Sequence, residues 1–187
     1  MKFSMKKVTV LLADGFEEIE ALTVVDLLRR AKVYVDTVSI TDDYTVRGAH
    51  GIPVQTEDLI TEIDFKESDM IVLPGGMPGT TNLKEDENVR KAVQEAYDDG
   101  RYVAAICAAP TILVDMGLLN GKRATCYPDM DCEIEDAYLT GAPVATDENI
   151  ITSQGVGTAI DFALKLIEVL ISEEKAVEIA DSIVYQR

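Results

Sequence analysis

The sequence contains one histidine, His50, and no tryptophan among its 187 residues. A zinc site built from several histidines is therefore excluded. Any Ser-His-Asp or Cys-His catalytic system would have to use His50 itself. His50 lies in a glycine-rich stretch with no recognisable motif around it, so we expect it at the surface.

Basic residues are scarce. There are 17 Lys and Arg against 34 Asp and Glu, which gives a formal net charge of −17. A surface this acidic repels phosphate backbones and anionic lipid headgroups, and no local basic patch offsets it. Nucleic-acid binding and membrane-surface binding are therefore not expected.

Cysteines are few and odd in number: Cys107, Cys126 and Cys132. This count does not indicate a disulfide framework. The apolar run at 8–13 is too short for the core of a signal peptide, and no stretch approaches the ~18 apolar residues of a membrane span. We therefore expect a protein of a reducing compartment, the cytoplasm. We also expect Cys132, in an acidic loop, to be unreactive.

No linker, repeat or break in composition interrupts the chain, and 47% of its residues are hydrophobic. A chain of this length can bury a core of its own. We expect a single domain spanning residues 1–187.

Apolar, β-branched runs alternate with helical patterns along the chain. This alternation predicts βαβ units and a doubly wound, mostly parallel α/β sheet with helices on both faces. Active sites in such sheets lie beyond the carboxyl ends of the strands. The expected strands are 7–13, 33–40, 70–73, 102–106, 124–127, 142–146 and 150–152, with an irregular hairpin at 46–55. The expected helices are 17–30, 88–99, 110–116, 158–171 and 173–182, the last with Ser172 as its N-cap.

Cys107 stands where the predicted strand 102–106 turns into a helix. Small neighbours, Ala108 among them, allow a sharp elbow that exposes the side chain. The start of the helix favours a thiolate over a thiol. Gly75 and Gly76, after the strand 70–73, can point backbone N–H groups at a ligand, and with the Ala108 N–H they could form an oxyanion hole. From the residues alone, an inert buried cysteine remains the alternative.

Glu17, Glu18 and Glu20 open the first predicted helix. We interpret Glu17 and Glu18 as acids whose negative charges interact favourably with the positive, N-terminal end of the helix dipole. Glu20 points elsewhere on the helix. A carboxyl group that stays protonated beside a cysteine can act as its acid/base partner, but sequence spacing cannot show such a contact.

Seven motifs occur in order with ordinary spacing, and the resemblance that they carry covers about residues 7–184. The sequence resembles the ThiJ/PfpI superfamily, in the branch of the Parkinson-disease-associated protein deglycase and the bacterial YajL-like proteins. The motifs are ADGFEEIE, VVDLLRRA, VRG, VLPGGMPG, AAICAAPTIL, ATCYP and TSQGVGTAIDFALKLIE.

This resemblance implies a flavodoxin-like fold, a homodimer, and a reactive cysteine at Cys107 with a protonated Glu20 hydrogen-bonded to it. The N–H groups of Gly76 and Ala108 would hold the oxyanion. The implied activity is a cofactor-free and metal-free glyoxalase that converts a small reactive carbonyl such as methylglyoxal to lactate. Protein deglycation is also associated with the family, as are chaperone-like behaviour and oxidative-stress sensing.

The sequence departs from the family pattern at several positions. Ala108 replaces the histidine that follows the cysteine in the protease-like branch. A peptidase mechanism would therefore lack its catalytic base. Tyr127 stands where human-type proteins carry a histidine, and Met77 replaces a polar pocket residue. We expect Gly75, Met77 and Tyr127 to line or border the pocket.

Two charged residues are weaker candidates for the same pocket. Asp26 lies six positions after Glu20 on the same predicted helix, and an exposed or paired carboxylate is the alternative. Arg47 matches a family arginine near the pocket and could hold an anion, with a solvated hairpin residue as the alternative.

Two other functions compete with the enzyme. In one, oxidation of Cys107 makes the protein a stress sensor or chaperone, because an exposed reactive thiol is also the one that peroxide attacks. In the other, the domain is a flavodoxin-like binding module, but its first loop, ADGFEE, is acidic and would repel phosphate.

Overall fold

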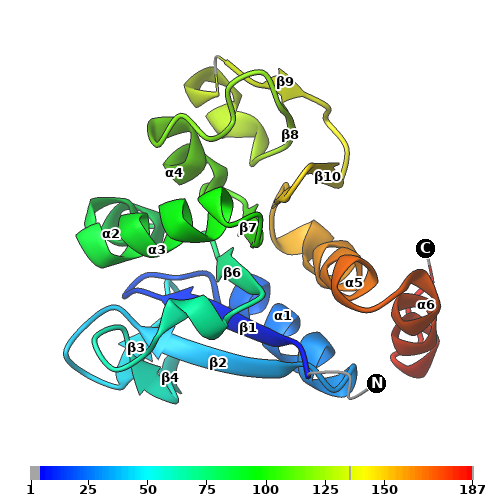
Figure 1. Cartoon of the computed structure of the whole chain (residues 1–187), viewed down its shortest axis with the longest axis horizontal. Helices are drawn as coiled ribbons and strands as arrows, with labels where there is room; N and C mark the ends of the chain where they lie inside the picture. The colour runs from blue at the N-terminus through cyan, green and yellow to red at the C-terminus, as the bar shows by residue number, and fades with distance from the viewer. Residues whose placement is uncertain (1–4, 135, 187) are drawn as a thin grey trace.

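The computed structural model describes residues 5–134 and 136–186, without the side chains of 131–133. Its centre is a seven-stranded sheet in the order β10-β11-β7-β6-β1-β2-β5. Neighbouring strands are parallel except for the antiparallel pair β10–β11. The strands are β1 Lys7–Leu12, β2 Tyr34–Ser39, β5 Asp58–Leu59, β6 Met70–Leu73, β7 Tyr102–Ile106, β10 Val144–Asp147 and β11 Ile150–Ser153. The predicted doubly wound, mostly parallel sheet is confirmed (Figure 1).

Helices cover both faces of this sheet, so side chains of the central strands are buried alternately on each side. In β6, Met70 and Val72 join the core beneath α1 and α5, whereas Ile71 and Leu73 join the core beneath α3 and α4. The first face carries α1 Glu18–Arg30, α5 Ala159–Leu170 and α6 Glu173–Ser182. The second carries α2 Gly79–Glu85, α3 Glu87–Asp98 and α4 Pro110–Asp115 (Figure 1).

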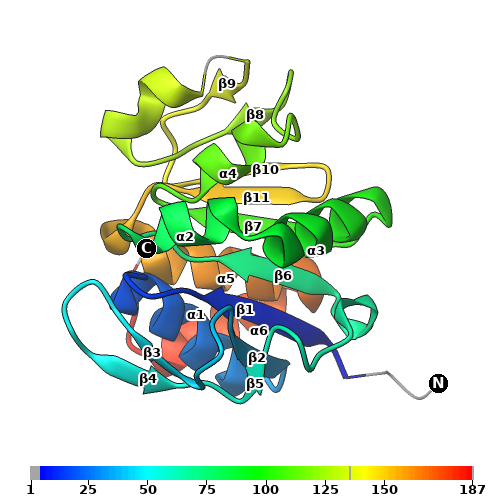
Figure 2. The ribbon, with the colours of Figure 1, turned by 90° about the vertical axis from the view of Figure 1, so that its left-hand side faces the viewer.

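Smaller elements extend the two ends of the sheet. Figure 2 shows an antiparallel hairpin at one end and a parallel two-strand pair at the other. The hairpin is β3 Thr45–Arg47 and β4 Pro53–Gln55, and the pair is β8 Arg123–Ala124 and β9 Tyr138–Leu139. Three short 3-10 helices complete the described chain: η1 Phe65–Glu67, η2 Pro128–Glu133 and η3 Val156–Thr158.

Most element boundaries agree with the sequence prediction, and β6 and β7 agree at both ends. The expected strand at 124–127 is largely wrong, because only Arg123–Ala124 pairs as a strand. Beyond it, Thr125 N–H donates to Thr152 Oγ1 at 2.9 Å and Tyr127 N–H donates to the Cys107 carbonyl at 2.9 Å. These bonds fix the segment against the elbow. Sequence analysis missed α2 and β5, which are short.

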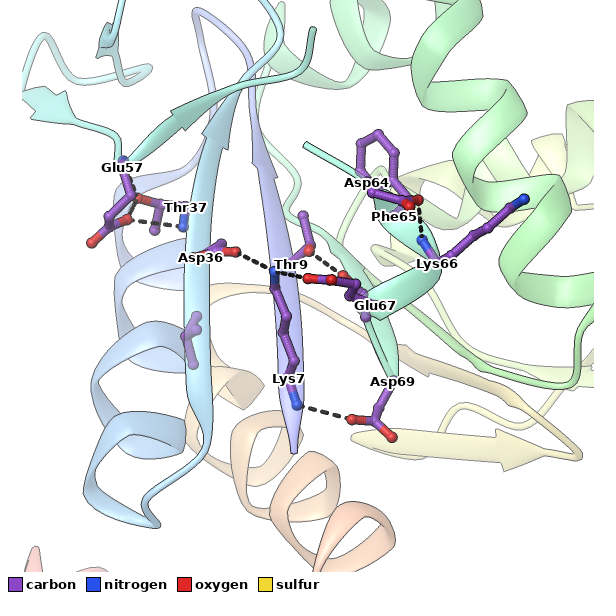
Figure 3. A network of polar contacts seen from close by, with 12 residues as sticks. Lys7, Thr9, Asp36, Thr37, Glu57, Asp64, Phe65, Lys66, Glu67 and Asp69 are labelled. Carbon is purple, nitrogen blue, oxygen red and sulfur yellow. Dashed lines mark hydrogen bonds and ion pairs between the residues drawn. The ribbon is translucent and has the colours of Figure 1, made fainter. Parts of the chain in front are cut away.

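A network of polar side chains lies at the amino-terminal ends of the central strands, at the opposite end of the sheet from Cys107 (Figure 3). Lys7 Nζ lies 3.1 Å from Asp36 Oδ2 and 3.4 Å from Glu67 Oε2. The Lys7 backbone N–H donates to Asp69 Oδ2 at 2.9 Å. Asp36 is buried, so Lys7 supplies the positive charge that a carboxylate at this depth requires. The network joins β1, β2 and the turn before β6.

Candidate active site

Three loops meet beyond the carboxyl ends of β1, β6 and β7, three adjacent strands of the sheet. They border a cavity of about 530 Å³. The cavity is lined by Glu17, Glu20, Gly76, Cys107, Tyr127, Pro128 and residues 154–158. The structure therefore places Cys107, Glu20, Gly76 and Tyr127, all named from the sequence, around one space.

Cys107 occupies a sharp turn between β7 and α4. Its φ is 65°, a left-handed conformation that few non-glycine residues adopt. Hydrogen bonds hold the backbone there on both sides, since Cys107 N–H donates to Ser153 O at 3.0 Å and the Cys107 carbonyl accepts from Tyr127 N–H at 2.9 Å. Such strain persists only where the surroundings enforce it, and it is typical of functional sites. The side chain is half-buried and faces the cavity.

Glu20, in the first turn of α1, is completely buried beside the cysteine. Its Oε2 accepts a hydrogen bond from Gly75 N–H at 2.9 Å. Its Oε1 makes no hydrogen bond of ordinary geometry with the described residues. A methyl group added at Gly155 would lie 3.7 Å from both Glu20 Oε1 and Cys107 Sγ, so the two atoms face the same point. The direct interaction between the thiol and the carboxyl group, which shifts the pKa of both groups, places them close enough to exchange a proton.

Two glycines make this approach possible. A Cβ at Gly75 would lie 2.6 Å from Cys107 Cβ and 2.6 Å from Glu20 Oε2, closer than real Cβ contacts allow. Gly76 has a φ of 92°, and a Cβ there would meet Glu17 N at 2.4 Å. The Gly75 carbonyl also accepts from Glu17 N–H at 2.8 Å, which ties the start of α1 to this loop. Side chains at these positions would separate the elbow from the helix.

Glu20 and Cys107 both have pKa values above their ordinary ranges. Burial raises the pKa of Glu20 to about 7, with the negative charge of Glu17 acting in the same direction and hydrogen bonds from Cys107 and Gly75 opposing it. Burial, the charge of Glu20 and its hydrogen bond to the thiol together raise the pKa of Cys107 to about 12. Backbone N–H groups of Ala108 and Gly76 near the sulfur act in the opposite direction and lower it.

The sequence expectation of an acidic thiol is therefore wrong. The helix start does favour the thiolate, but removal from water and the adjacent carboxylate outweigh it. Above a pH of about 7 the Cys107–Glu20 pair holds a single proton, placed on either the sulfur or the carboxylate. Transfer of that proton to Glu20 generates the thiolate without a low pKa for Cys107 itself.

Other residues named from the sequence lie away from the cavity. Asp26 forms an exposed ion pair with Arg30 at 2.8 Å, so the structure does not bring it to the pocket. The Arg47 guanidinium donates to Gly51 O at 2.8 Å within the hairpin region and is not among the lining residues. Met77 is 54% exposed and borders a neighbouring pocket together with Ala108.

Sequence analysis missed two features around the cavity. Glu17 lines the cavity, and so does Gly155, where an added Cβ would lie 3.7 Å from Cys107 Sγ. Glu18 has a role beyond its interaction with the helix dipole. It is buried, and it accepts a hydrogen bond from His50 N–H at 2.8 Å. His50 is exposed as expected, but it lies against Glu17 and Glu18. No sequence signal links these positions, because 32 residues separate Glu18 from His50.

The other cysteines lie outside this constellation. Cys126 is buried and is not among the residues that line the cavity. The side chain of Cys132 lies outside the described part of the chain. None of the described helices has both the length and the apolar character needed to cross a bilayer.

Comparison with known proteins places this site in a family. Residues 6–169 match the DJ-1/PfpI family. Protein DJ-1 homolog B of Arabidopsis thaliana is 39% identical over 186 residues, which are 98% of this chain and 42% of that protein, so the chain spans less than half of that relative. The protein of Schizosaccharomyces pombe named glutathione-independent glyoxalase DJ-1 is 34% identical over 182 residues, covering 91% of this chain and 94% of that protein. The structure of oxidised Toxoplasma gondii DJ-1 superposes with a TM-score of 0.94 at 37% identity and covers 97% of this chain and 100% of that one. The chain belongs to the DJ-1/PfpI family and has its flavodoxin-like α/β fold.

Proposed function

We propose that the protein is a cofactor-independent cysteine enzyme that converts small α-oxoaldehydes, such as methylglyoxal, to 2-hydroxy acids. One observation carries the proposal: Cys107 Sγ and the buried Glu20 carboxyl face the same point of the cavity, and the backbone N–H groups of Gly76 and Ala108 lie near the sulfur. The glyoxalase name of the Schizosaccharomyces pombe relative supports this reaction class.

The first step joins the sulfur to the aldehyde. The thiol proton moves to Glu20, and the thiolate attacks the aldehyde carbon of the substrate. The negative charge that develops on the aldehyde oxygen is stabilised by the N–H groups of Gly76 and Ala108. Glu20 then returns its proton to that oxygen. The product is a neutral hemithioacetal, with Glu20 ionised again.

The second step transfers a proton between the two carbons. Glu20 removes the hydrogen from the former aldehyde carbon, and the electrons move through an enediolate. The proton is then delivered to the former ketone carbon, while the hydroxyl proton passes from the first oxygen to the second. The first carbon is thereby oxidised to a thioester and the second is reduced to an alcohol, so no external oxidant is needed. Water hydrolyses the thioester, releasing the 2-hydroxy acid and restoring the thiol.

The presence of Tyr127 in place of a histidine determines how many of the proton transfers Glu20 must carry out. It lines the cavity where the family resemblance leads one to expect a histidine. In this proposal Glu20 carries both proton transfers, and Tyr127 provides a wall of the cavity. Acid–base help of this kind contributes roughly 10²–10⁴-fold to a rate.

The same chemistry extends to aldehyde adducts on protein side chains, which makes protein deglycation a second activity within the proposal. We also propose that the protein is a cytoplasmic homodimer. The low and odd number of cysteines in the sequence suits a reducing compartment. Ile19 and Leu22 on α1 are exposed and offer apolar surface to a second copy.

A lactate assay with methylglyoxal tests the enzyme directly. Wild-type protein should form lactate over many turnovers, and Cys107→Ala should form none above the uncatalysed rate. Cys126→Ala is the matched control, because it removes a cysteine that does not line the cavity, and it should keep the wild-type rate. Unchanged turnover in Cys107→Ala would refute the proposal.

One observation favours an oxidative-stress sensor as a second function. Cys107 is half-buried at a solvent-accessible cavity, and the N–H groups near its sulfur could bind the oxygens of a sulfinate. Mass spectrometry after mild peroxide treatment separates the two functions. Two added oxygens on Cys107 in a protein that forms no lactate would favour the sensor.

A further inference from the structure

Three potential metal ligands meet outside the Cys107–Glu20 pair, and one of them, Glu17, also lines the cavity. The carboxylate oxygens of Glu17 and Glu18 and a ring nitrogen of His50 all lie within 4.8 Å of one another. His50 Nδ1 lies 2.9 Å from Glu18 Oε2 and 3.5 Å from Glu17 Oε2. Zinc bonds of ~2.0–2.1 Å to nitrogen and oxygen place tetrahedral ligands roughly 3.3 Å apart. The spacing of these atoms therefore fits around one ion without a large movement.

The buried carboxylate of Glu18 shows that this group is built into the fold. Glu18 is only 4% exposed. The loop 48–52 wraps it: His50 N–H donates to Oε1 at 2.8 Å, Ile52 N–H approaches Oε1 at 3.4 Å, and a Cβ at Gly48 would lie 2.2 Å from Oε1. These bonds fix the carboxylate and leave Oε2 directed at the imidazole.

The charge balance of the group is unusual. Buried carboxylates are ordinarily paired with a cation or bound to a metal. In the described chain, the ion-pair partner of Glu18 is His50, whose side chain is 67% exposed, rather than a lysine or arginine. His50 must carry a proton to offset even one of the two carboxylates. The exposed ring leaves an open route for an ion and room for water ligands.

We propose that Glu17, Glu18 and His50 form a binding site for a borderline divalent transition-metal ion, with Zn²⁺ as its representative. Imidazole selects such ions over Mg²⁺ and Ca²⁺, which prefer oxygen ligands alone. The metal takes the place of the proton on His50 Nδ1, so that one metal ion enters and one proton leaves. Metal binding here does not require the proposed enzyme activity, although Glu17 also lines the active-site cavity.

Protons compete with the metal for this site. The hydrogen bond to Glu18 and the charges of Glu17 and Glu18 raise the pKa of His50. The remaining charged groups nearby are Arg47 of the hairpin, whose guanidinium bonds Gly51 O, and Asp14, whose carboxylate accepts from Arg47 N–H. Zinc affinity should therefore rise with pH as His50 loses its proton.

Isothermal titration of the full chain with Zn²⁺ tests the site without any activity assay. The titrations use the Cys107→Ala variant, because a thiolate at Cys107 would be a competing ligand. We expect one Zn²⁺ per chain, with proton release that shows in buffers of different ionisation enthalpy. His50→Gln should weaken binding by at least about tenfold, and Glu17→Gln should weaken it also. His50→Gln keeps the backbone N–H that holds Glu18, and an unchanged melting temperature checks the fold. Glu85→Gln, which removes an exposed carboxylate on α2, is the matched control and should bind as tightly as its parent.

Cobalt spectra identify the donor atoms. Co²⁺ bound at this site should give visible d–d bands without the near-ultraviolet thiolate charge-transfer band in both wild-type and Cys107→Ala protein. Equal zinc affinity in His50→Gln would overturn the proposal. So would a thiolate band that persists in Cys107→Ala, binding of Mg²⁺ as tight as that of Zn²⁺, or zinc-induced association of chains through other residues.

Discussion

Glu20→Gln is the substitution whose effect follows most directly from the structure. Glutamine has the shape of glutamate, so its oxygen can still accept from Gly75 N–H while its amide faces Cys107. What it removes is the ionisable group. Burial raises the pKa of Glu20 from its ordinary 4.5 to about 7. The substitution should therefore change how the free energy of unfolding depends on pH as well as the chemistry.

The sign follows from proton linkage. Between pH 4.5 and 7 the folded protein keeps a proton on Glu20 that the unfolded chain releases, so wild-type stability falls as pH rises through this window. Integrated from pH 5 to pH 8, the difference between the folded and unfolded pKa corresponds to about 2.5 kcal/mol. Glu20→Gln lacks this loss, because glutamine does not ionise. Relative to wild type, the variant should gain about this much stability over the same range.

Urea unfolding at pH 5 and pH 8, at one fixed protein concentration, measures the difference. The other carboxylates titrate alike in both proteins and cancel in the comparison. Glu85→Gln, which removes an exposed carboxylate of α2, is the matched control and should follow wild type at both pH values. A Glu20→Gln variant whose stability parallels wild type would show that Glu20 ionises normally, and the argument for a shared proton would fail.

The remaining predictions concern the glycine loop, the pH profile and the opposite edge of the sheet. Gly75→Ala should abolish activity and cost about 1–3 kcal/mol of stability, because the added carbon collides with both Cys107 and Glu20; normal activity in this variant would contradict the packing. The kcat/KM for methylglyoxal should rise with pH to a plateau, with an apparent pKa near the value of about 7 at which the pair loses its first proton, and Glu20→Gln should lose this rise. Lys7→Gln should lower the free energy of unfolding by about 2 kcal/mol, because it leaves the buried Asp36 without its cation. Alkylation of Cys107 should stay at the wild-type rate. Unchanged denaturation would show that the Lys7–Asp36 pair adds nothing to stability.

The sheet and its helices could be predicted because local patterns carry them. Strand β7 begins and ends where its apolar run does, and α6 begins after Ser172, whose Oγ accepts from Lys175 N–H at 3.2 Å. The segment 125–127 has the apolar, β-branched character of a strand, yet its N–H groups bond Thr152 and Cys107. Such bonds depend on tertiary neighbours, which a sequence pattern does not contain.

The candidate site was only partly predictable. The elbow at Cys107 is visible in the sequence as a strand end with small neighbours, but its partner Glu20 lies 87 positions earlier in the numbering and was named through family resemblance. The direction of the thiol pKa was missed, because the helix start is a local feature whereas burial and the charge of Glu20 are not. The contact of Glu18 with His50 was missed for the same reason.

The rate of lactate formation by Glu20→Gln, with the accessibility of Cys107 followed in parallel, tests the central claim most directly. If the buried carboxyl carries the proton between the two substrate carbons, the variant should form lactate at least about 10²-fold more slowly than wild type while iodoacetamide still modifies Cys107. Lactate at the wild-type rate from a variant that cannot accept a proton at this position would contradict the account.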